Sequence, residues 1–432
     1  MTTLFENIFE SYAYSYPHKH SYRRLAPLSL KELWEPEKKD ALFLYVHLPF
    51  CEMRCGFCNL FTMANPKEDM VNAYLQALER EAVALKQLVE PVGFGQMAVG
   101  GGTPTFLELP QLEKLFAIIR RLGAQPENIP VSFEMSPQTI TAAKAELLLA
   151  QGVSRVSIGI QSFLETEQKA LGRPQKNKEA FAALDLLKQY PFGAVNVDLI
   201  YGAQGQTVDT WLYSVEEAIR YEVEEVFIYP LYIRPLTGIT RSGVLPEDNR
   251  PALYQAAKNA LITAGYEQVS MRMFRRGKTN APTTLYSCQE DGMMGLGAGA
   301  RSYTKAVHYS SEYAVARHNI KSIIDQYALK TTQDFGYADY GIVLSREEQQ
   351  RRFIIKSILH STGLDLTRYQ ALYGSLPADD YPQLQQLQEH GLAIQQDQLL
   401  TLTSAGIDYS DAIGPWLYST GINERINSFA LQ

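Results

Sequence analysis

Three of the four cysteines stand close together, and their spacing restricts what this chain can bind and fold around. Cys51, Cys55 and Cys58 form the pattern CxxxCxxC directly after an apolar, strand-like run, FLYVHLPF. Thiolates are soft ligands that favour zinc or iron–sulfur clusters, yet three thiolates fill only three corners of a tetrahedral or cubane site. Another group must therefore occupy the fourth corner.

Such cysteines can also bind zinc or form a disulfide. A structural zinc site normally has a fourth Cys or His at a short spacing, and the residues after Cys58 provide neither. Disulfide frameworks are typical of small secreted proteins, whereas this chain has 432 residues and begins with MTTLFENIFESY, which is not a basic leader. The residues favour a [4Fe–4S] cluster with one open iron, and a structural zinc protein is the alternative.

Length and charge indicate a cytoplasmic protein of two or three domains. At roughly 150 residues per domain, 432 residues correspond to two or three units. No apolar run approaches the ~18 residues that span a bilayer. The net charge of −7 gives no overall electrostatic attraction for nucleic acid. We therefore expect a small-molecule substrate and neither a membrane nor a nucleic-acid partner.

Strand-like and helix-like segments alternate for more than two hundred residues, which predicts an α/β fold with a parallel sheet. The expected strands are residues 43–50, 96–102, 131–135, 155–160, 194–202 and 225–233. Between them, apolar residues recur with the 3.6-residue period of a helix. Six such units predict a partial (β/α)6 TIM-like barrel. Ligands bind such barrels at the carboxyl ends of the strands, where the cysteine loop falls.

The sequence divides into four expected parts. Residues 1–40 form an N-terminal extension that covers the barrel, residues 41–245 the barrel core, and residues 246–340 a barrel extension and substrate-facing segment. Residues 341–432 form a helical, winged-helix-like accessory domain. That part is not strongly basic, so we expect it to pack against the barrel as a lid instead of binding DNA.

Two glycine-rich runs differ in their context. The run GGGTPT ends the second expected strand and lacks the Gly-Lys-Ser/Thr of a phosphate loop. Consecutive glycines let a ligand approach the backbone closely, so we expect a binding site there. The run GLGAGA, Gly295 to Ala300, follows the polar stretch CQEDGMM and not a strand, which argues against a Rossmann motif.

The cysteine pattern and the glycine run resemble those of radical SAM enzymes, in which the open iron binds S-adenosylmethionine. Over roughly residues 40–310, the motifs YVHLPFC, CGFC, GGGTPT, SFEMSP, SIGIQSF and NVDLIYG are similar to the oxygen-independent coproporphyrinogen III oxidase-like, or HemN/HemW-like, family. The resemblance implies a [4Fe–4S] cluster, one or two S-adenosylmethionine molecules, and a 5′-deoxyadenosyl radical that takes a hydrogen atom from the substrate. It also implies a flavodoxin- or ferredoxin-type electron donor and a role in porphyrin biosynthesis.

The same resemblance implies that nine residues contact the cofactor. These are Tyr45, Phe57, Gly101, Gly102, Thr103, Glu134, Gln161, Arg173 and Asp198. Glu134 and Asp198 end apolar strands, where a carboxylate can accept hydrogen bonds from ribose hydroxyls or a methionyl ammonium. Arg173 can pair with a carboxylate. The alternatives are solvated strand ends for the acids, a surface position for Arg173, and a shield around the cluster for Phe57.

Two departures from the family leave the substrate open. Coproporphyrinogen oxidases of this group have an extra cysteine two residues after the third cluster ligand, where this chain has Leu60. The haem chaperones have an HNxxYW motif, where this chain has TTLYSC. We expect hydrogen abstraction from a propionate side chain followed by loss of CO₂. A methyl transfer or another reaction with two S-adenosylmethionines is one alternative, and a haem-binding or haem-delivery protein is another.

Several other side chains have two interpretations. Cys288 is either a buried, inert thiol or a hydrogen-atom donor or substrate ligand. A basic group could bind substrate carboxylates or form a solvated rim, and it comprises Arg272, Arg275, Arg276, Lys278 and Arg301. His18 and His20 lack the spacing of a metal site and are expected on the surface, while His47, inside a strand, is expected as a satisfied core or surface group.

Overall fold

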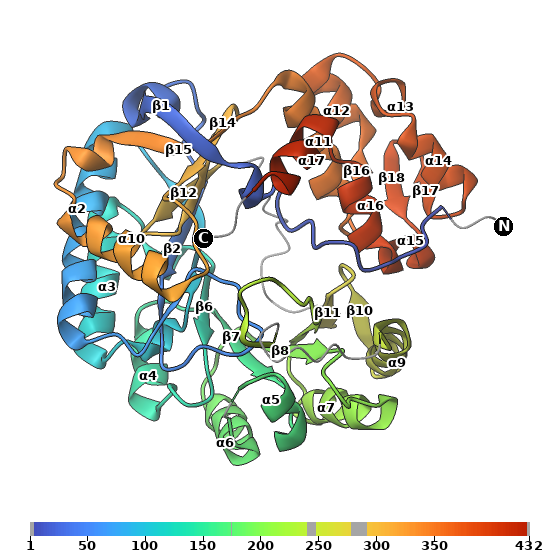
Figure 1. The fold of residues 1–432 in the computed structure, drawn as a ribbon, viewed down its shortest axis with the longest axis horizontal. Helices are drawn as coiled ribbons and strands as arrows, with labels where there is room; N and C mark the ends of the chain where they lie inside the picture. Colours follow the sequence, from blue (N-terminus) through green and yellow to red (C-terminus); the bar gives the residue numbers. More distant parts are fainter. Residues whose placement is uncertain (1–3, 174, 240–247, 278–291, 430–432) are drawn as a thin grey trace.

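The computed structural model describes residues 4–173, 175–239, 248–277 and 292–429. Within these residues the main sheet has thirteen strands, in the order β1-β15-β14-β13-β12-β2-β5-β6-β7-β8-β9-β11-β10. Helices cover the outer face of the curved parallel region, and a separate, mostly helical part stands beside the antiparallel strands (Figure 1).

The six strands predicted from the sequence are adjacent and parallel, which confirms the partial barrel. They are β2 (Leu42–Leu48), β5 (Phe94–Gly101), β6 (Val131–Met135), β7 (Arg155–Gln161), β8 (Ala194–Tyr201) and β9 (Glu225–Pro230). A seventh parallel strand, β12 (Met293–Leu296), pairs with β2 on its other side. The sequence did not predict β12, because this short MMGL segment has no alternation of apolar and polar residues.

The crossover helices follow the predicted period and bury one face against the sheet. They are α2 (Glu68–Val89), α3 (Leu109–Leu122), α4 (Ala142–Ala150), α5 (Glu165–Ala170), α6 (Asn177–Leu187), α7 (Val208–Arg220) and α9 (Arg250–Thr263). In α3, Leu112, Leu115 and Ile119 are buried at helical spacing. Gly123 ends α3 with a φ of 116°, a conformation that glycine adopts without strain.

Antiparallel strands extend both edges of the parallel region. On one side lie β13 (Arg301–Tyr303), β14 (Val307–Ser310), β15 (Tyr337–Val343) and β1 (Arg23–Ser29), and on the other lie β11 (Met273–Arg276) and β10 (Tyr266–Gln268). Because β1 pairs with β15, the N-terminal segment is anchored to a strand from late in the chain. Helices α1 (Leu30–Trp34) and α10 (Arg317–Leu329) pack against α2.

Residues beyond 343 form a second apolar core, with the predicted helices and hairpin. Its helices are α11 (Arg346–Ile358), α12 (Leu366–Tyr373), α13 (Pro377–Asp380), α14 (Gln383–Glu389), α15 (Ser404–Asp408), α16 (Ser410–Trp416) and α17 (Thr420–Asn427). A small sheet joins β16 (Leu364–Asp365) to the hairpin of β17 (Ala393–Gln396) and β18 (Leu399–Leu402). Ala13 and Tyr16 of the N-terminal segment belong to the same core.

The second core is docked on the barrel through polar contacts. Lys258 of α9 forms an ion pair with Asp408 at 2.6 Å, and Tyr254 donates to the same carboxylate at 2.9 Å. The N-terminal segment runs along this junction (Figure 1), where Ser11 N donates to the Asp411 carbonyl at 3.1 Å. No helix in the described ranges combines the length and the apolar character that a bilayer span requires.

Candidate active site

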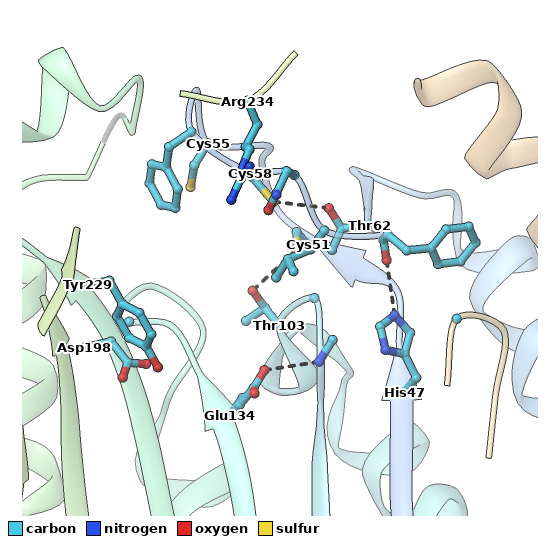
Figure 2. A pocket seen from close by; sticks show the side chains of 18 of the residues that line it. His47, Cys51, Cys55, Cys58, Thr62, Thr103, Glu134, Asp198, Tyr229 and Arg234 are labelled. Atoms are coloured by element: carbon cyan, nitrogen blue, oxygen red, sulfur yellow. Dashed lines mark hydrogen bonds between the residues drawn. The ribbon is translucent and has the colours of Figure 1, made fainter. Parts of the chain in front are cut away.

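A cavity of about 650 Å³ lies at the carboxyl ends of the parallel strands, beneath the cysteine loop (Figure 2). The three cysteines and all nine residues that the resemblance assigned to the cofactor line it: Cys51, Cys55, Cys58, Tyr45, Phe57, Gly101, Gly102, Thr103, Glu134, Gln161, Arg173 and Asp198. These residues come from segments that span more than half of the barrel sequence. The barrel topology brings them together, because successive parallel strands end at the same edge.

The cysteine loop is held by backbone contacts on both sides. Cys51 lies in β3 (Phe50–Cys51), which pairs with β4 (Met63–Ala64). Gly56 N donates to the Gly172 carbonyl at 3.1 Å, and a Cβ at Gly56 would lie 2.9 Å from the Leu171 carbonyl oxygen. Glycine therefore allows the loop to pack closely against the segment after α5.

Each cysteine sulfur has a polar neighbour. Arg173 Nη1 donates to Cys55 Sγ at 3.4 Å, Thr103 Oγ1 donates to Cys51 Sγ at 3.7 Å, and Cys58 Sγ is 3.8 Å from Thr62 Oγ1. Burial raises the pKa of Cys51 to about 12 and also raises the pKa of Cys55. Buried thiolates are stabilised when a metal binds them, so this site is suited to metal coordination.

The donor set fits a cluster better than a single ion. In the described residues, no group of three or more His, Cys, Asp or Glu side chains is arranged to hold one metal ion. A structural zinc ion normally takes four protein ligands. A cubane cluster can take one thiolate on each of three irons and leave the fourth iron open, which matches three cysteines.

Two carboxyl groups that face the cavity form its floor at the ends of β6 and β8. Glu134 accepts a hydrogen bond from Gly101 N at 3.1 Å. Asp198 accepts from Asn196 Nδ2 at 2.8 Å and from Ser157 Oγ at 3.2 Å. Burial raises the pKa of Glu134 to about 7 and the pKa of Asp198 to about 6, and the Asp198 charge adds to the effect on Glu134. Both groups are therefore ready to accept a cationic ligand.

The glycine run leaves no room for side chains beside these acids. A Cβ at Gly100 would lie 2.6 Å from Glu134 Cδ, and one at Gly101 would lie 2.5 Å from His47 Cε1. Gly101 also has a φ of 111°. Gln161, at the end of β7, has a φ of 72°, which is uncommon for a residue with a side chain and typical of functional sites.

Two protein-family models match this chain, and one of them covers the residues of the cavity just described. Residues 45–218 match the model of the radical SAM superfamily, and residues 344–409 match the model of the HemN C-terminal domain. The first match includes the cysteine loop and the floor of the cavity. The chain belongs to the HemN/HemW-like family of radical SAM proteins.

Relatives within this family have different names. The haem chaperone HemW of Bacillus subtilis is 27% identical over 84% of this chain and 95% of its own length. The oxygen-independent coproporphyrinogen III oxidase of Escherichia coli K12 is 25% identical over 84% of this chain and 82% of its own length. The solved E. coli coproporphyrinogen III oxidase HemN has the same fold, with a TM-score of 0.81, 23% identity, and coverage of 97% of this chain and 98% of that one.

As a member of the HemN/HemW-like family, this chain has a [4Fe–4S] cluster and S-adenosylmethionine as its cofactors. The residues of the cavity fit them. Three thiols leave one iron of a cubane open, and the acids and glycine backbone below can receive the ammonium and ribose groups of S-adenosylmethionine. The cavity volume also lies within the range of small-molecule sites.

One interpretation of the basic residues, that they form a single patch for substrate carboxylates in this HemN/HemW-like site, is wrong. Arg272 pairs with Asp411, Arg275 with Glu225 at 2.8 Å, and Arg276 with Glu222 at 2.8 Å. Side chains alternate along a strand and face different neighbours, so sequence proximity did not place them together. Among the described members, Arg301 alone lines the cavity. Lys278 and Cys288 lie outside the described residues.

Sequence reasoning missed much of the cavity's lining. Further residues line it: Tyr12, Tyr14, His18, Lys19, His20, His47, Tyr229, Tyr232, Arg234 and Tyr313. The placement of His18 and His20 on the surface was wrong, because the N-terminal segment folds back over the strand ends. His47 is a core group, one of the two expected positions, and its Nε2 is 3.1 Å from the Phe61 carbonyl. The dense tyrosines of SYAYSYPHKHSY were the available signal.

Proposed function

We propose that this chain is a radical SAM enzyme that removes a hydrogen atom from a carboxylated side chain of a tetrapyrrole, in a coproporphyrinogen oxidase-like oxidative decarboxylation. One observation carries the proposal. A single cavity has the cysteine loop on one side, acids and bare backbone on the floor, and tyrosines with basic side chains around its wall. A tetrapyrrole, which combines aromatic rings with carboxylates at its edge, matches that lining.

In this proposal Cys51, Cys55 and Cys58 would hold the cluster, and the uncoordinated iron would be left for S-adenosylmethionine. When bound and reduced, these cofactors would supply a carbon-centred radical that takes a hydrogen atom from the propionate side chain; the substrate would then lose CO₂ and pass one electron to an external electron acceptor. Glu134 accepts the methionyl ammonium, with Gly101 N orienting its carboxylate at 3.1 Å. Asp198, oriented by Asn196, accepts hydroxyl groups of the ribose.

Other residues position the reacting groups and exclude water. Arg173 spans from Cys55 Sγ to the Gly159 carbonyl, to which Nη2 donates at 2.7 Å, so it ties the cysteine loop to the end of β7. Phe57 packs against Leu171 and Leu231 in a small apolar cluster beside the loop. An apolar wall of this kind limits the access of water to the cluster and to a radical.

The test is anaerobic reconstitution with iron and sulfide, followed by reduction and incubation with S-adenosylmethionine and coproporphyrinogen III. Formation of 5′-deoxyadenosine together with products that have lost CO₂ supports the proposal. A product heavier by a methyl group would identify a methyl transfer instead. Formation of 5′-deoxyadenosine with the tetrapyrrole unchanged would reject this substrate, and the absence of cleavage by a protein with a full cluster would reject the enzyme.

Haem binding is a second candidate, and the imidazoles in the cavity favour it. Burial lowers the pKa of His20 to about 3 and keeps the pKa of His18 well below its usual range, so both rings are neutral and able to bind iron. The haem chaperone relative covers most of this chain. Titration with haem, followed by its absorption spectrum, tests the idea. A His18→Ala/His20→Ala variant that binds haem with an unchanged spectrum would exclude these two ligands.

A further inference from the structure

Two basic side chains from distant segments line this cavity. Lys19 lies in the short η1 helix (Lys19–Ser21), and Arg301 begins β13; both line the cavity. Lys19 Nζ is 3.6 Å from the centroid of the Tyr313 ring. The Arg301 guanidinium is 4.9 Å from the centroid of Tyr14, and its Nη1 donates to Ser15 Oγ at 3.3 Å.

Neither side chain has an acidic partner in the part of the chain that the structure describes. Two more deeply buried cations do have one: Arg272 pairs with Asp411, and Lys258 pairs with Asp408. Removing a charge from water is costly unless a counter-ion compensates it. Lys19 and Arg301 therefore differ from these basic groups in a way that packing does not explain.

Nearby acids are already engaged elsewhere. Glu312 lines the cavity but pairs with Arg24 at 2.6 Å. Glu134 and Asp198 lie on the floor, where backbone and side-chain donors hold them. Burial, and next the charge of Arg301, keep the pKa of Lys19 well below its usual range, so an anion placed between the two would stabilise the charged lysine.

We infer that Lys19 and Arg301 form a binding site for the carboxylates of the substrate. The neighbouring tyrosine rings select the class of ligand, because they offer flat, apolar surfaces to the body of the molecule. The site therefore takes a planar aromatic or tetrapyrrole compound with two carboxylates along one edge. This inference rests on the proposed function and deepens it, since it concerns the same cavity.

Arg234 strengthens the positive field around this site. It also lines the cavity, and Figure 2 shows its side chain above the cysteine loop, close to Cys58. Its charge contributes to the lowered pKa of Lys19. The cations thus come from the N-terminal segment, the loop after β9 and strand β13. A ligand that joins them would hold the N-terminal segment against the barrel.

The experiment compares mesoporphyrin IX, which has two carboxylates, with its dimethyl ester. Binding to the full-length, cluster-loaded protein is followed by porphyrin fluorescence without reductant. We expect the diacid to bind more tightly than the ester. Lys19→Gln and Arg301→Gln should each weaken diacid binding by about ten- to a hundredfold, the range for a hydrogen bond to a charged group, and should leave ester binding unchanged.

Arg301→Lys and Arg276→Gln are the matched controls. Arg301→Lys keeps the charge and should recover part of the affinity, whereas Arg276 pairs with Glu222 outside the cavity, so its loss should change nothing. Equal binding of the diacid and the ester by the wild type would overturn the inference. So would equal losses for both ligands in a variant that retains its cluster.

The proposed function is tested separately, by cleavage of S-adenosylmethionine. If cleavage fails but the two variants lose only diacid affinity, the carboxylate site stands and the proposed reaction falls. If cleavage succeeds and neither substitution weakens binding of the diacid relative to the ester, the reverse holds.

Discussion

Arg272 and Asp411 form a two-pronged ion pair that joins the barrel to the C-terminal helices. Arg272 Nη1 donates to Asp411 Oδ1 at 2.7 Å, and Nη2 donates to Oδ2. The side chains are 4% and 1% exposed. The ring of Tyr12 stacks on the guanidinium at 3.7 Å, and Tyr12 lines the cavity. The pair therefore links the C-terminal helices to the wall of the active site.

Asp411→Ala should destabilise the protein by about 3–5 kcal/mol, because it leaves the Arg272 charge buried without a partner. Chemical denaturation measures the change. Arg272→Met/Asp411→Leu, which removes both charges, should recover most of the loss. If Asp411→Ala is as stable as the wild type, the charge of Arg272 has found another partner.

Replacing Cys55 by Ala should abolish the [4Fe–4S] cluster, because two thiolates remain for a site that needs three. Iron and sulfide content after anaerobic reconstitution, together with the electron paramagnetic resonance of the reduced protein, measures the loss. Cys288→Ser is the control and should retain the cluster. An intact cluster in Cys55→Ala would remove Cys55 from the proposed ligands.

The affinity for S-adenosylmethionine should fall as the pH decreases through about 7. The pKa of Glu134 is raised to about 7, so below that pH the group is protonated and no longer pairs with the methionyl ammonium. Between pH 8 and pH 6 we expect the dissociation constant to rise about tenfold. Calorimetric titration measures it. Glu134→Gln should bind weakly at both pH values, and an equal pH dependence in this variant would assign the effect to another group such as Asp198.

Arg173→Leu should lower the reduction potential of the cluster. The guanidinium donates to Cys55 Sγ at 3.4 Å, and a donor or positive charge near a thiolate favours the reduced, more negative state. A loss on the order of 60 mV corresponds to a tenfold change for one electron. A spectroscopic redox titration measures it. Arg173→Lys keeps the positive charge, so its cluster should have a reduction potential between those of the wild type and Arg173→Leu. Identical potentials in all three proteins would contradict this role.

Gly101→Ala should damage the cofactor site more than the fold. The new methyl group would lie 2.5 Å from His47 Cε1, at a φ of 111° that alanine rarely adopts. We expect a loss of S-adenosylmethionine binding of tenfold or more, on the order of the 1–3 kcal/mol that such strain costs. Gly123→Ala serves for comparison, since its φ is similar and its Cβ would meet nothing within 4 Å. Equal binding by both variants would contradict a specific role of Gly101 in the cofactor site.

Local patterns predicted the barrel well and its flanks poorly. The six central strands are apolar runs bounded by helical segments, so each was visible in the sequence. Strand β12 was not, because four residues carry too little pattern, and its place beside β2 depends on a contact between distant parts of the chain. The N-terminal segment likewise shares a core with helices from the end of the chain.

The sequence by itself determined the chemistry at the cysteine loop, since the spacing of Cys51, Cys55 and Cys58 is a local property and leaves one corner of a site open. It also determined that the strand-end residues would meet, because parallel strands end at one edge. Only the tertiary structure decided which cations face the cavity. Arg272 turns to Asp411, while Lys19 and Arg301 approach from distant parts of the chain. Long-range packing sets those positions, and no local pattern encodes them.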